Sequence, residues 1–258
     1  MNVMKSIEQL IIPTGGSRSF QNRELVLFAF LIALGVFLRF WGLGNVGLHG
    51  DEETMAMPAL AVLEHGGPYL PSGMFYPRAL VQVYLMAGSV WVFGESEWAF
   101  RFPSALIGSL IPLLAFFLGR RFLSPRFNLI FVAVMAVLPA MIEYSQTARM
   151  YIFWLAALMF FGSCIFRWER KNTIRSLAGA IVAWLIALHF HALSILAAPI
   201  FLFPGIIRRS WSNLFQGAIA IAACIFAFSI NGAWIGAQYP DSSERPDREI
   251  VSTVFTDC

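Results

Sequence analysis

Charged residues and cysteines are scarce in this chain. Only 13% of its 258 residues are Asp, Glu, Lys or Arg, whereas 58% are hydrophobic, with 25 Phe and 8 Trp. Soluble domains are about 25% charged and about 45–50% apolar, so this composition excludes an ordinary soluble domain. The 3 cysteines form no disulfide framework and no zinc motif. The net charge of +3 matters mainly for its placement between apolar segments, and no nucleic-acid partner is predicted.

Long runs without a charged residue hold most of the apolar side chains. A helix needs about 20 mostly apolar residues to cross a bilayer, and the longest run can hold two short spans with a break near residues 189–194. We therefore predict an all-α, polytopic membrane helix bundle with about seven spans. The first apolar stretch ends without a small-residue cleavage site, which indicates a retained signal anchor. The uncharged runs are residues 26–38, 102–119, 127–142, 152–166, 176–207 and 211–235.

Basic residues fall in short blocks between these runs. Short loops rich in Lys and Arg stay in the cytoplasm, so we predict a multi-pass protein of the plasma (inner) membrane with a cytoplasmic N-terminus. The spans then cover residues 24–44, 101–119, 127–143, 150–167, 175–190, 191–207 and 211–235, approximately. The basic blocks are Lys5, Arg18 and Arg23; Arg120, Arg121 and Arg126; Arg167, Arg170, Lys171 and Arg175; and Arg208 and Arg209.

The first outer loop, residues 45–100, is predicted to hold two helices, at 51–65 and 79–94. The turn-rich segment GGPYLPSGMFYP separates them. The second helix is apolar enough to span, but a span here would place the next basic block outside. We therefore expect it to lie in the membrane interface, with Gln82 and Tyr84 on its wetter face.

Three adjacent carboxylates, Asp51, Glu52 and Glu53, open this loop. In one interpretation Asp51 is only a helix N-cap. In the other, these acids act together with polar groups at the outer ends of the spans, because arginine binds phosphate through paired hydrogen bonds and a nearby carboxylate can serve as a general base. That combination favours a transferase that uses a lipid-phosphate donor. The candidate substrate-binding residues are Arg78, Arg101, Tyr144, Arg149, Tyr151, His189 and His191.

Three stretches carry a family resemblance. The first, LRFWGLGNVGLHGDEETMAM, joins a first span to an outer-loop Asp-Glu pair. The second is FGESEWAFRFPSALIGSLIPLLAFFLGRR, and the third is YSQTARMYIFWLAALMFF. Together they resemble the polytopic glycosyltransferases of the GT-C fold, in the group of dolichyl-phosphate-mannose protein mannosyltransferases (glycosyltransferase family 39) and lipid A aminoarabinose transferases. The resemblance extends over roughly residues 24–235.

The resemblance implies transfer of a sugar from a polyprenyl-phosphate donor on the outer face of the membrane. It makes Asp51 the catalytic acid or general base, with Glu52 beside it, and gives the donor contacts to basic and aromatic residues of the outer loops. The chain departs from the family pattern at Arg78, where a His-Pro-Pro or Lys-Pro pair is frequent nearby. It also departs at Gln146, where a charged residue is usual.

The resemblance also implies a domain organisation. We predict a cytoplasmic tail at residues 1–23, a GT-C-like transmembrane module at 24–235, and the start of a truncated outer loop at 236–258. Family members usually continue further, so a truncated or degenerate non-catalytic membrane subunit is an alternative. A lipid-linked sugar transporter is a second alternative, although the apolar runs lack charged residues and no internal repeat is visible.

Three further points stay open at the sequence level. Arg101 is either a donor contact or the structural partner of Glu97, four residues before it. No cofactor is indicated, but a divalent metal held by Asp51, His189 and His191 is conceivable. The partners predicted are the polyprenyl-phosphate sugar, membrane lipid and an acceptor that the sequence does not identify.

Overall fold

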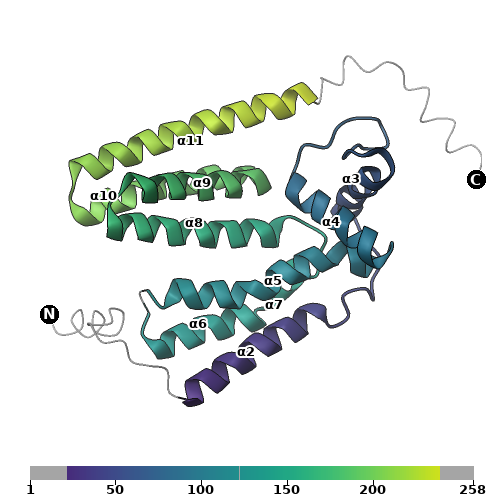
Figure 1. Ribbon diagram of the computed structural model, residues 1–258, viewed down its shortest axis with the longest axis horizontal. Helices are drawn as coiled ribbons and strands as arrows, with labels where there is room; N and C mark the ends of the chain where they lie inside the picture. Colours follow the sequence, from purple (N-terminus) through teal and green to yellow (C-terminus); the bar gives the residue numbers. More distant parts are fainter. Residues whose placement is uncertain (1–21, 122, 239–258) are drawn as a thin grey trace, which may run out of the picture.

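The computed structural model describes residues 22–121 and 123–238, with side chains described up to residue 230. Within these ranges the regular elements are helices, and one isolated β-bridge joins Tyr69 to Phe75. The long helices lie side by side, and two shorter ones pack across one end (Figure 1). The predicted all-α helical bundle is therefore confirmed. The tail predicted at 1–23 and the outer segment predicted at 236–258 lie almost wholly outside the described residues.

The helices follow the predicted segments closely. Both outer-loop helices are present, as α3 and α4, and the predicted break near 189–194 separates α9 from the 3₁₀ helix η1. The segment predicted as one span at 127–143 is instead broken at Leu138 into α6 and α7, which meet at 47°. The elements are α2 (Asn22–Phe40), α3 (Asp51–His65), α4 (Leu80–Phe93), α5 (Glu97–Gly119), α6 (Pro125–Val137), α7 (Pro139–Ser145), α8 (Tyr151–Lys171), α9 (Ile174–Phe190), η1 (Ala192–Leu202), α10 (Phe203–Arg208) and α11 (Trp211–Gln238).

Three of the described helices, α5, α8 and α11, are long and apolar enough to cross a membrane, and a fourth span results if the bent pair α6–α7 counts as one. These helices support an integral membrane protein. Helix α4, with 14 residues, reaches only about 21 Å, less than the roughly 30 Å of a hydrocarbon core. The helix α9 and the combined segment η1–α10 are also short, and α2 carries Glu24 and Arg39. The total of seven spans therefore stays a prediction.

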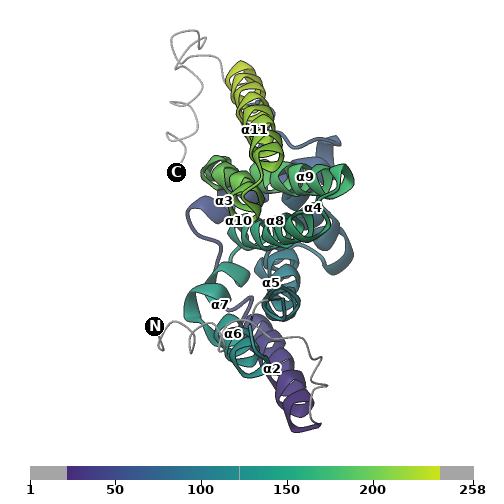
Figure 2. The ribbon, with the colours of Figure 1, turned by 90° about the vertical axis from the view of Figure 1, so that its left-hand side faces the viewer.

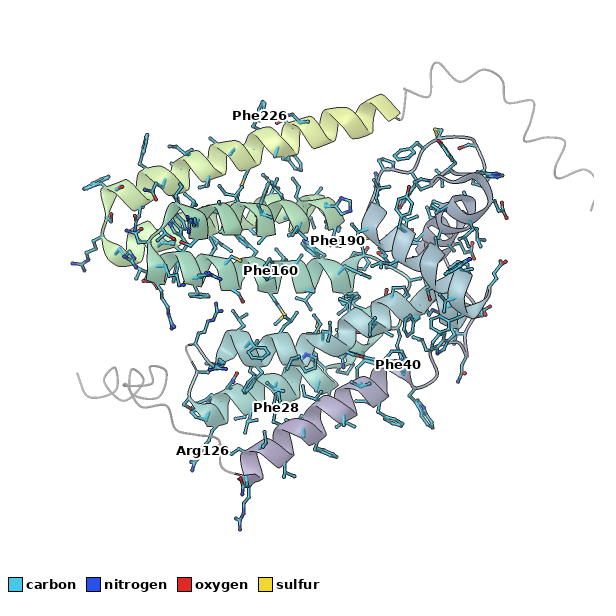
Figure 3. All side chains as sticks on the ribbon, in the orientation of Figure 1. Phe28, Phe40, Arg126, Phe160, Phe190 and Phe226 are labelled. Carbon is cyan, nitrogen blue, oxygen red and sulfur yellow. The ribbon has the colours of Figure 1, made fainter. Side chains whose placement is uncertain are left out.

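Alternating helix directions gather the charged residues at the two ends of the bundle. The turns α5–α6, α8–α9 and α10–α11 lie at one end, together with the start of α2, and we call this the basic end. Helices α3 and α4 lie at the other end with the starts of α5 and α8 (Figures 1 and 2), and we call this the site end. Figure 3 shows Arg126 at the basic end, and Phe40 and Phe190 toward the site end. The separation agrees with the predicted topology.

Helix α4 buries one face against α3 and α5 and exposes the other. Tyr84 is exposed, as expected, but the placement of Gln82 on the same wetter face is wrong, because its side chain is completely buried. The helix is apolar on both faces, and Trp91 and Val92 are among its most exposed residues. An exposed apolar face of this kind suits the membrane interface better than water.

Buried Arg39, near the end of α2, compensates for the break after α6. Pro139 has no backbone N–H, so the carbonyl of Met135, four residues earlier, loses its helical partner. Arg39 Nη2 donates to Met135 O at 2.9 Å, and Nη1 donates to Ala136 O at 2.9 Å. The guanidinium thus satisfies the carbonyl of Met135 that the proline leaves open, binds that of Ala136 as well, and ties α2 to α6.

A second polar contact ties α2 to α7. The side-chain nitrogen of Gln146 donates to the carbonyls of Leu38 and Trp41 at 3.0 Å and 2.9 Å, at the end of α2. Helix α7 also lies close to α5, because Gly108 has no side chain. A Cβ atom at this glycine would lie 2.5 Å from the Cβ of Ser145. These contacts hold the α7–α8 loop against the end of α2, where the site is built.

The two-ended arrangement predicts a labelling pattern in intact cells. In a background with the native cysteines replaced, a membrane-impermeant maleimide should label Glu64→Cys at the site end without permeabilisation. Lys171→Cys, at the basic end, should be labelled only after the membrane is opened, because positively charged short loops stay inside. Labelling of both positions from the same side of an intact membrane would contradict the topology.

Candidate functional site

Glu52 and Arg101 form a buried ion pair at the site end. Glu52 lies in the first turn of α3 and Arg101 in the first turns of α5, and their exposed fractions are only 2% and 4%. Arg101 Nε donates to Glu52 Oε1 at 2.9 Å, and Nη2 donates to Oε2 at 2.7 Å. The contact is therefore bidentate, the geometry in which arginine and carboxylate interact most strongly.

The other N–H groups of Arg101 bind backbone oxygens in the turn after α2. Nη1 donates to Leu43 O at 3.1 Å and to Val46 O at 2.6 Å, and Nη2 donates to Gly47 O at 3.1 Å. With the two bonds to Glu52, these contacts use all five donors of the guanidinium. Arg101 therefore keeps no N–H for a phosphate, in contrast to its predicted role. The alternative structural role fits this geometry, but the suggested partner, Glu97, is wrong.

Both oxygens of Glu52 accept further contacts. The backbone N–H of Ala148, in the α7–α8 loop, donates to Oε1 at 2.6 Å, and His49 Nδ1 lies 3.2 Å from Oε2. Burial alone would raise the pKa of the Glu52 carboxyl, but the hydrogen bonds and charge of Arg101, with the Ala148 amide, outweigh it and hold the pKa below its usual value. Glu52 is thus an ionised, fully occupied carboxylate.

Asp51, the neighbour of Glu52, is exposed and pairs with Arg149. Its side chain is 75% exposed, that of Arg149 is 13% exposed, and Arg149 Nη2 lies 2.8 Å from Asp51 Oδ2. Arg149 Nη1 also donates to the backbone oxygen of Asp51 at 2.9 Å. The N-cap of α3 is Gly50, with a φ of 57° and no side-chain cap, rather than Asp51. The N-cap interpretation of Asp51 is therefore wrong.

Aromatic rings extend from Arg149 along the start of α8. The guanidinium carbon of Arg149 lies 5.5 Å from the centroid of the Tyr151 ring, within cation–π range. The Tyr151 ring lies 5.4 Å from Tyr144 and 6.1 Å from His191, and the Trp154 ring stacks on His191 at 4.7 Å. The structure thus brings Tyr144, Arg149, Tyr151 and His191 close together, while their role in substrate binding stays a prediction.

Trp154 belongs to this aromatic cluster, although the sequence analysis did not single it out. It follows Tyr151 by three residues, a spacing that places both side chains on one face of a helix, so the signal was present. Its indole N–H donates to Ser194 Oγ at 2.8 Å, and the indole of Trp184 donates to Ser194 O at 2.8 Å. The first bond ties the start of η1 to α8, and the second ties it to α9.

The remaining predicted residues, His189 and Arg78, lie where α9 ends and α4 begins. His189 Nε2 accepts a hydrogen bond from the backbone N–H of Val81 at 3.3 Å. Arg78 is exposed, and it lies close enough to His191 to act on it electrostatically, as does Arg149. Asp51, His189 and His191 do not form a metal-binding group, since the described residues contain no such cluster of three His, Cys, Asp or Glu side chains.

These features define a class: an integral membrane helical bundle with an acid–arginine–aromatic site at one end. A model of the family described as dolichyl-phosphate-mannose-protein mannosyltransferase matches residues 77–234. Because this match covers more than half of the chain, the chain belongs to that family of membrane glycosyltransferases of the GT-C type. The matched range includes Arg101 and Arg149 but begins after Asp51 and Glu52. Comparisons with curated proteins and with solved structures give no match.

Loss of Arg101 should destabilise the fold strongly. Arg101→Met leaves the buried carboxylate of Glu52 without its partner, and breaking a buried pair in this way typically costs about 3–5 kcal/mol. The matched control is Arg120→Met at the exposed, basic end, which should leave stability nearly unchanged. Thermal unfolding in detergent, followed by tryptophan fluorescence, measures both. Equal transition temperatures for the two variants would show that the pair does not stabilise the fold.

Acid should weaken the same contact. The pKa of Glu52 in the folded state lies below its value of about 4.5 in the unfolded chain, so its contribution to stability is fully present above pH 4.5 and is lost as the pH falls through the folded-state pKa. The stability difference between the wild type and Glu52→Gln should therefore shrink as the pH is lowered below 4.5. A difference that is constant down to pH 3 would contradict this assignment.

Proposed function

We propose that this chain transfers a sugar from a polyprenyl-phosphate donor to a hydroxyl or amine group at the outer face of the membrane. The observation that carries the proposal is the Asp51–Arg149 pair. It sets an exposed carboxylate 2.8 Å from a largely buried guanidinium, beside aromatic rings and at the end of a membrane helix bundle. Family membership supports the coarser statement that the chain is a glycosyltransferase.

Asp51 is the general base in this proposal. Its carboxylate accepts the proton of the acceptor hydroxyl, and the acceptor oxygen forms a bond to the anomeric carbon of the donor sugar. The bond between that carbon and the phosphate oxygen breaks, and its electron pair leaves with the polyprenyl phosphate. Arg149 offsets the negative charge gained by the departing phosphate.

The geometry of Arg149 suits this task. Its side chain is held by Asp51 on one side and by the Tyr151 ring on the other. Its Nε is buried and has no hydrogen-bond partner within the part of the chain that the structure describes. Asp51 takes one N–H of each terminal nitrogen, so Nη1 and Nη2 each keep a second N–H that the described residues do not bond and that can serve an anion. This contrasts with Arg101, whose donors are all used.

The donor lies along the aromatic cluster in this proposal. Tyr144, Tyr151 and His191 offer ring faces to the sugar or to the first isoprene units, while exposed Arg78 supplies a second positive charge for the phosphate. His189, bonded to the start of α4, positions that helix rather than touching the donor. The site faces the outer leaflet because the basic end stays in the cytoplasm.

We assign Glu52 and Arg101 a positioning role. Both oxygens of Glu52 already accept hydrogen bonds or contacts from within the chain, so this carboxylate has no free place for an acceptor proton. The pair fixes the first turn of α3 and the Ala148 amide. It thereby holds Asp51, which precedes Glu52, in contact with Arg149, which follows Ala148.

Asp51→Asn provides the test of the proposed function. With the chain in lipid nanodiscs and a radiolabelled polyprenyl-phosphate sugar, this variant should lower kcat about 10²- to 10⁴-fold, the contribution typical of a general base. Glu53→Gln, which removes an exposed carboxylate two residues away, should keep wild-type turnover. EDTA added to the wild type tests in the same assay whether a divalent metal takes part.

Two outcomes would contradict the proposal. Equal turnover by wild type and Asp51→Asn would remove Asp51 from the mechanism. Absence of turnover by the wild type, with the chain folded as judged by thermal unfolding, would favour the alternative of a non-catalytic membrane subunit.

A further inference from the structure

A cleft of about 470 Å³ lies between the turn after α2 and helix α7. Leu43 and Val46 line it from the turn, and Pro139 and Ile142 line it from α7. Arg101 forms part of its wall, so the cleft lies directly beside the buried Glu52–Arg101 pair. The aromatic cluster at the start of α8 contributes none of its lining residues. The proposed donor surface and this cleft are therefore separate.

The side-chain donors that line the cleft are largely taken up within the chain: Thr147 Oγ1 donates to Tyr144 O at 3.4 Å, and His49 Nδ1 lies 3.2 Å from Glu52 Oε2. Arg101 lines the cleft, but its five N–H groups are all bonded within the chain. The amide nitrogen of Gln146, another lining residue, is bonded to two carbonyls of α2. The carboxylate of Glu143 lines the cleft as well, and within the described residues it takes part in no ion pair or side-chain hydrogen bond.

This arrangement selects the charge of a ligand. A cleft with a free carboxylate and no free cation repels phosphate and attracts hydrogen-bond donors, such as the hydroxyl groups of a sugar. The donor phosphate therefore belongs with Arg149 and Arg78, and the cleft is suited to the other substrate. Its volume lies within the range of about 300–1,000 Å³ that is usual for small-molecule sites.

The cleft also adjoins the Asp51–Arg149 pair. His49 lines the cleft and precedes Asp51 by two residues, and Thr147 lines it and precedes Arg149 by two. Two residues of chain span at most about 7 Å. A group that reaches out of the cleft past His49 is therefore close to Asp51.

We propose that this cleft is the acceptor subsite and that it holds the hydroxyl-bearing saccharide head group of a membrane lipid, with Glu143 and His49 binding its hydroxyls. The inference rests on the proposed function. A lipid is favoured because both walls are ends of bilayer segments, and because exposed apolar Trp41 (70%) and Leu138 (38%) directly precede the lining residues Gly42 and Pro139. A head group can enter at this level while its tails stay in the membrane.

Photolabelling tests the binding without any need for turnover. The probe is an alkyl glucoside with a diazirine next to the sugar, added to the full chain in nanodiscs, and labelled peptides are mapped by mass spectrometry. Label should concentrate in residues 42–49 and 139–147. Glu143→Gln should reduce it at least fivefold and Thr147→Trp, which fills the cleft, should do the same. Glu95→Gln removes an exposed carboxylate outside the cleft and should have no effect.

Further probes separate the alternatives. An alkyl phosphate with the same diazirine should label the region of residues 149–154 instead, and its appearance in the cleft would overturn the inference. Free methyl glucoside should compete weakly compared with the alkyl glucoside, because it lacks the tail. A serine-containing peptide that displaces the label as well as the alkyl glucoside does would show that the cleft takes protein, against the proposal.

Turnover then distinguishes this inference from the proposed function. If the wild type transfers sugar and Asp51→Asn does not, Glu143→Gln should raise the acceptor KM about tenfold and leave hydrolysis of the donor by water unchanged. A Glu143→Gln enzyme with unchanged acceptor KM and unchanged labelling would refute the subsite while leaving the proposed function intact. Labelling as expected without any turnover would support the subsite and contradict the proposed function.

Discussion

The buried pair of Glu52 and Arg101 is the contact on which the site end depends. One guanidinium joins the first turn of α3, the turn after α2 and the start of α5, and one carboxylate adds the α7–α8 loop through Ala148. Removing two charges from water is costly unless every hydrogen-bonding group finds a partner. Here all five donors of Arg101 do so. Lysine could not replace it, because an ammonium lacks the planar, bidentate fork.

The positions of Asp51 and Arg149 follow from the buried Glu52–Arg101 pair. Successive residues of an α-helix point about 100° apart, so a first turn of α3 that directs Glu52 inward directs Asp51 outward. In the α7–α8 loop the bond to Glu52 fixes the amide of Ala148, and Arg149 comes next in the chain. The Glu52–Arg101 pair thus holds Asp51 and Arg149 in contact, although 98 positions separate them in the sequence. Adjacent residues of α3 therefore serve two contacts: Glu52 forms the buried one with Arg101, and Asp51 forms the exposed one with Arg149.

The sequence predicted the helices more reliably than the contacts between them. The bounds of α3 were predictable because Gly50 and Gly66 flank it and acids fill its first turn. A break at Pro139 was predictable, because a proline in an apolar run kinks or ends a helix, but the contact of Arg39 with the open carbonyl of Met135 was not. Helix α4 is apolar all round, so no periodicity indicated that Gln82 faces inward. Glu52 and Arg101 were each noticed, but their pairing across 49 residues is a tertiary property.

Two arginines in similar positions therefore have different chemistry, and the difference lies in their hydrogen bonds rather than in their charge. Arg101 and Arg149 both begin or precede a membrane helix and both pair with a carboxylate at 2.7–2.8 Å. Arg101 is saturated by the protein, so its charge is neutralised and its geometry is fixed. Arg149 pairs with a carboxylate that is itself mostly in water, and each of its terminal nitrogens keeps a second N–H that the described residues do not bond. A phosphate gains more from the second than from the first, because displacing bonds from Arg101 would leave buried carbonyls and a buried carboxylate unpaired. In the proposed mechanism the saturated pair thereby makes the unsaturated one selective: the donor phosphate binds at Arg149, and the cleft beside Arg101 is left to a ligand without negative charge.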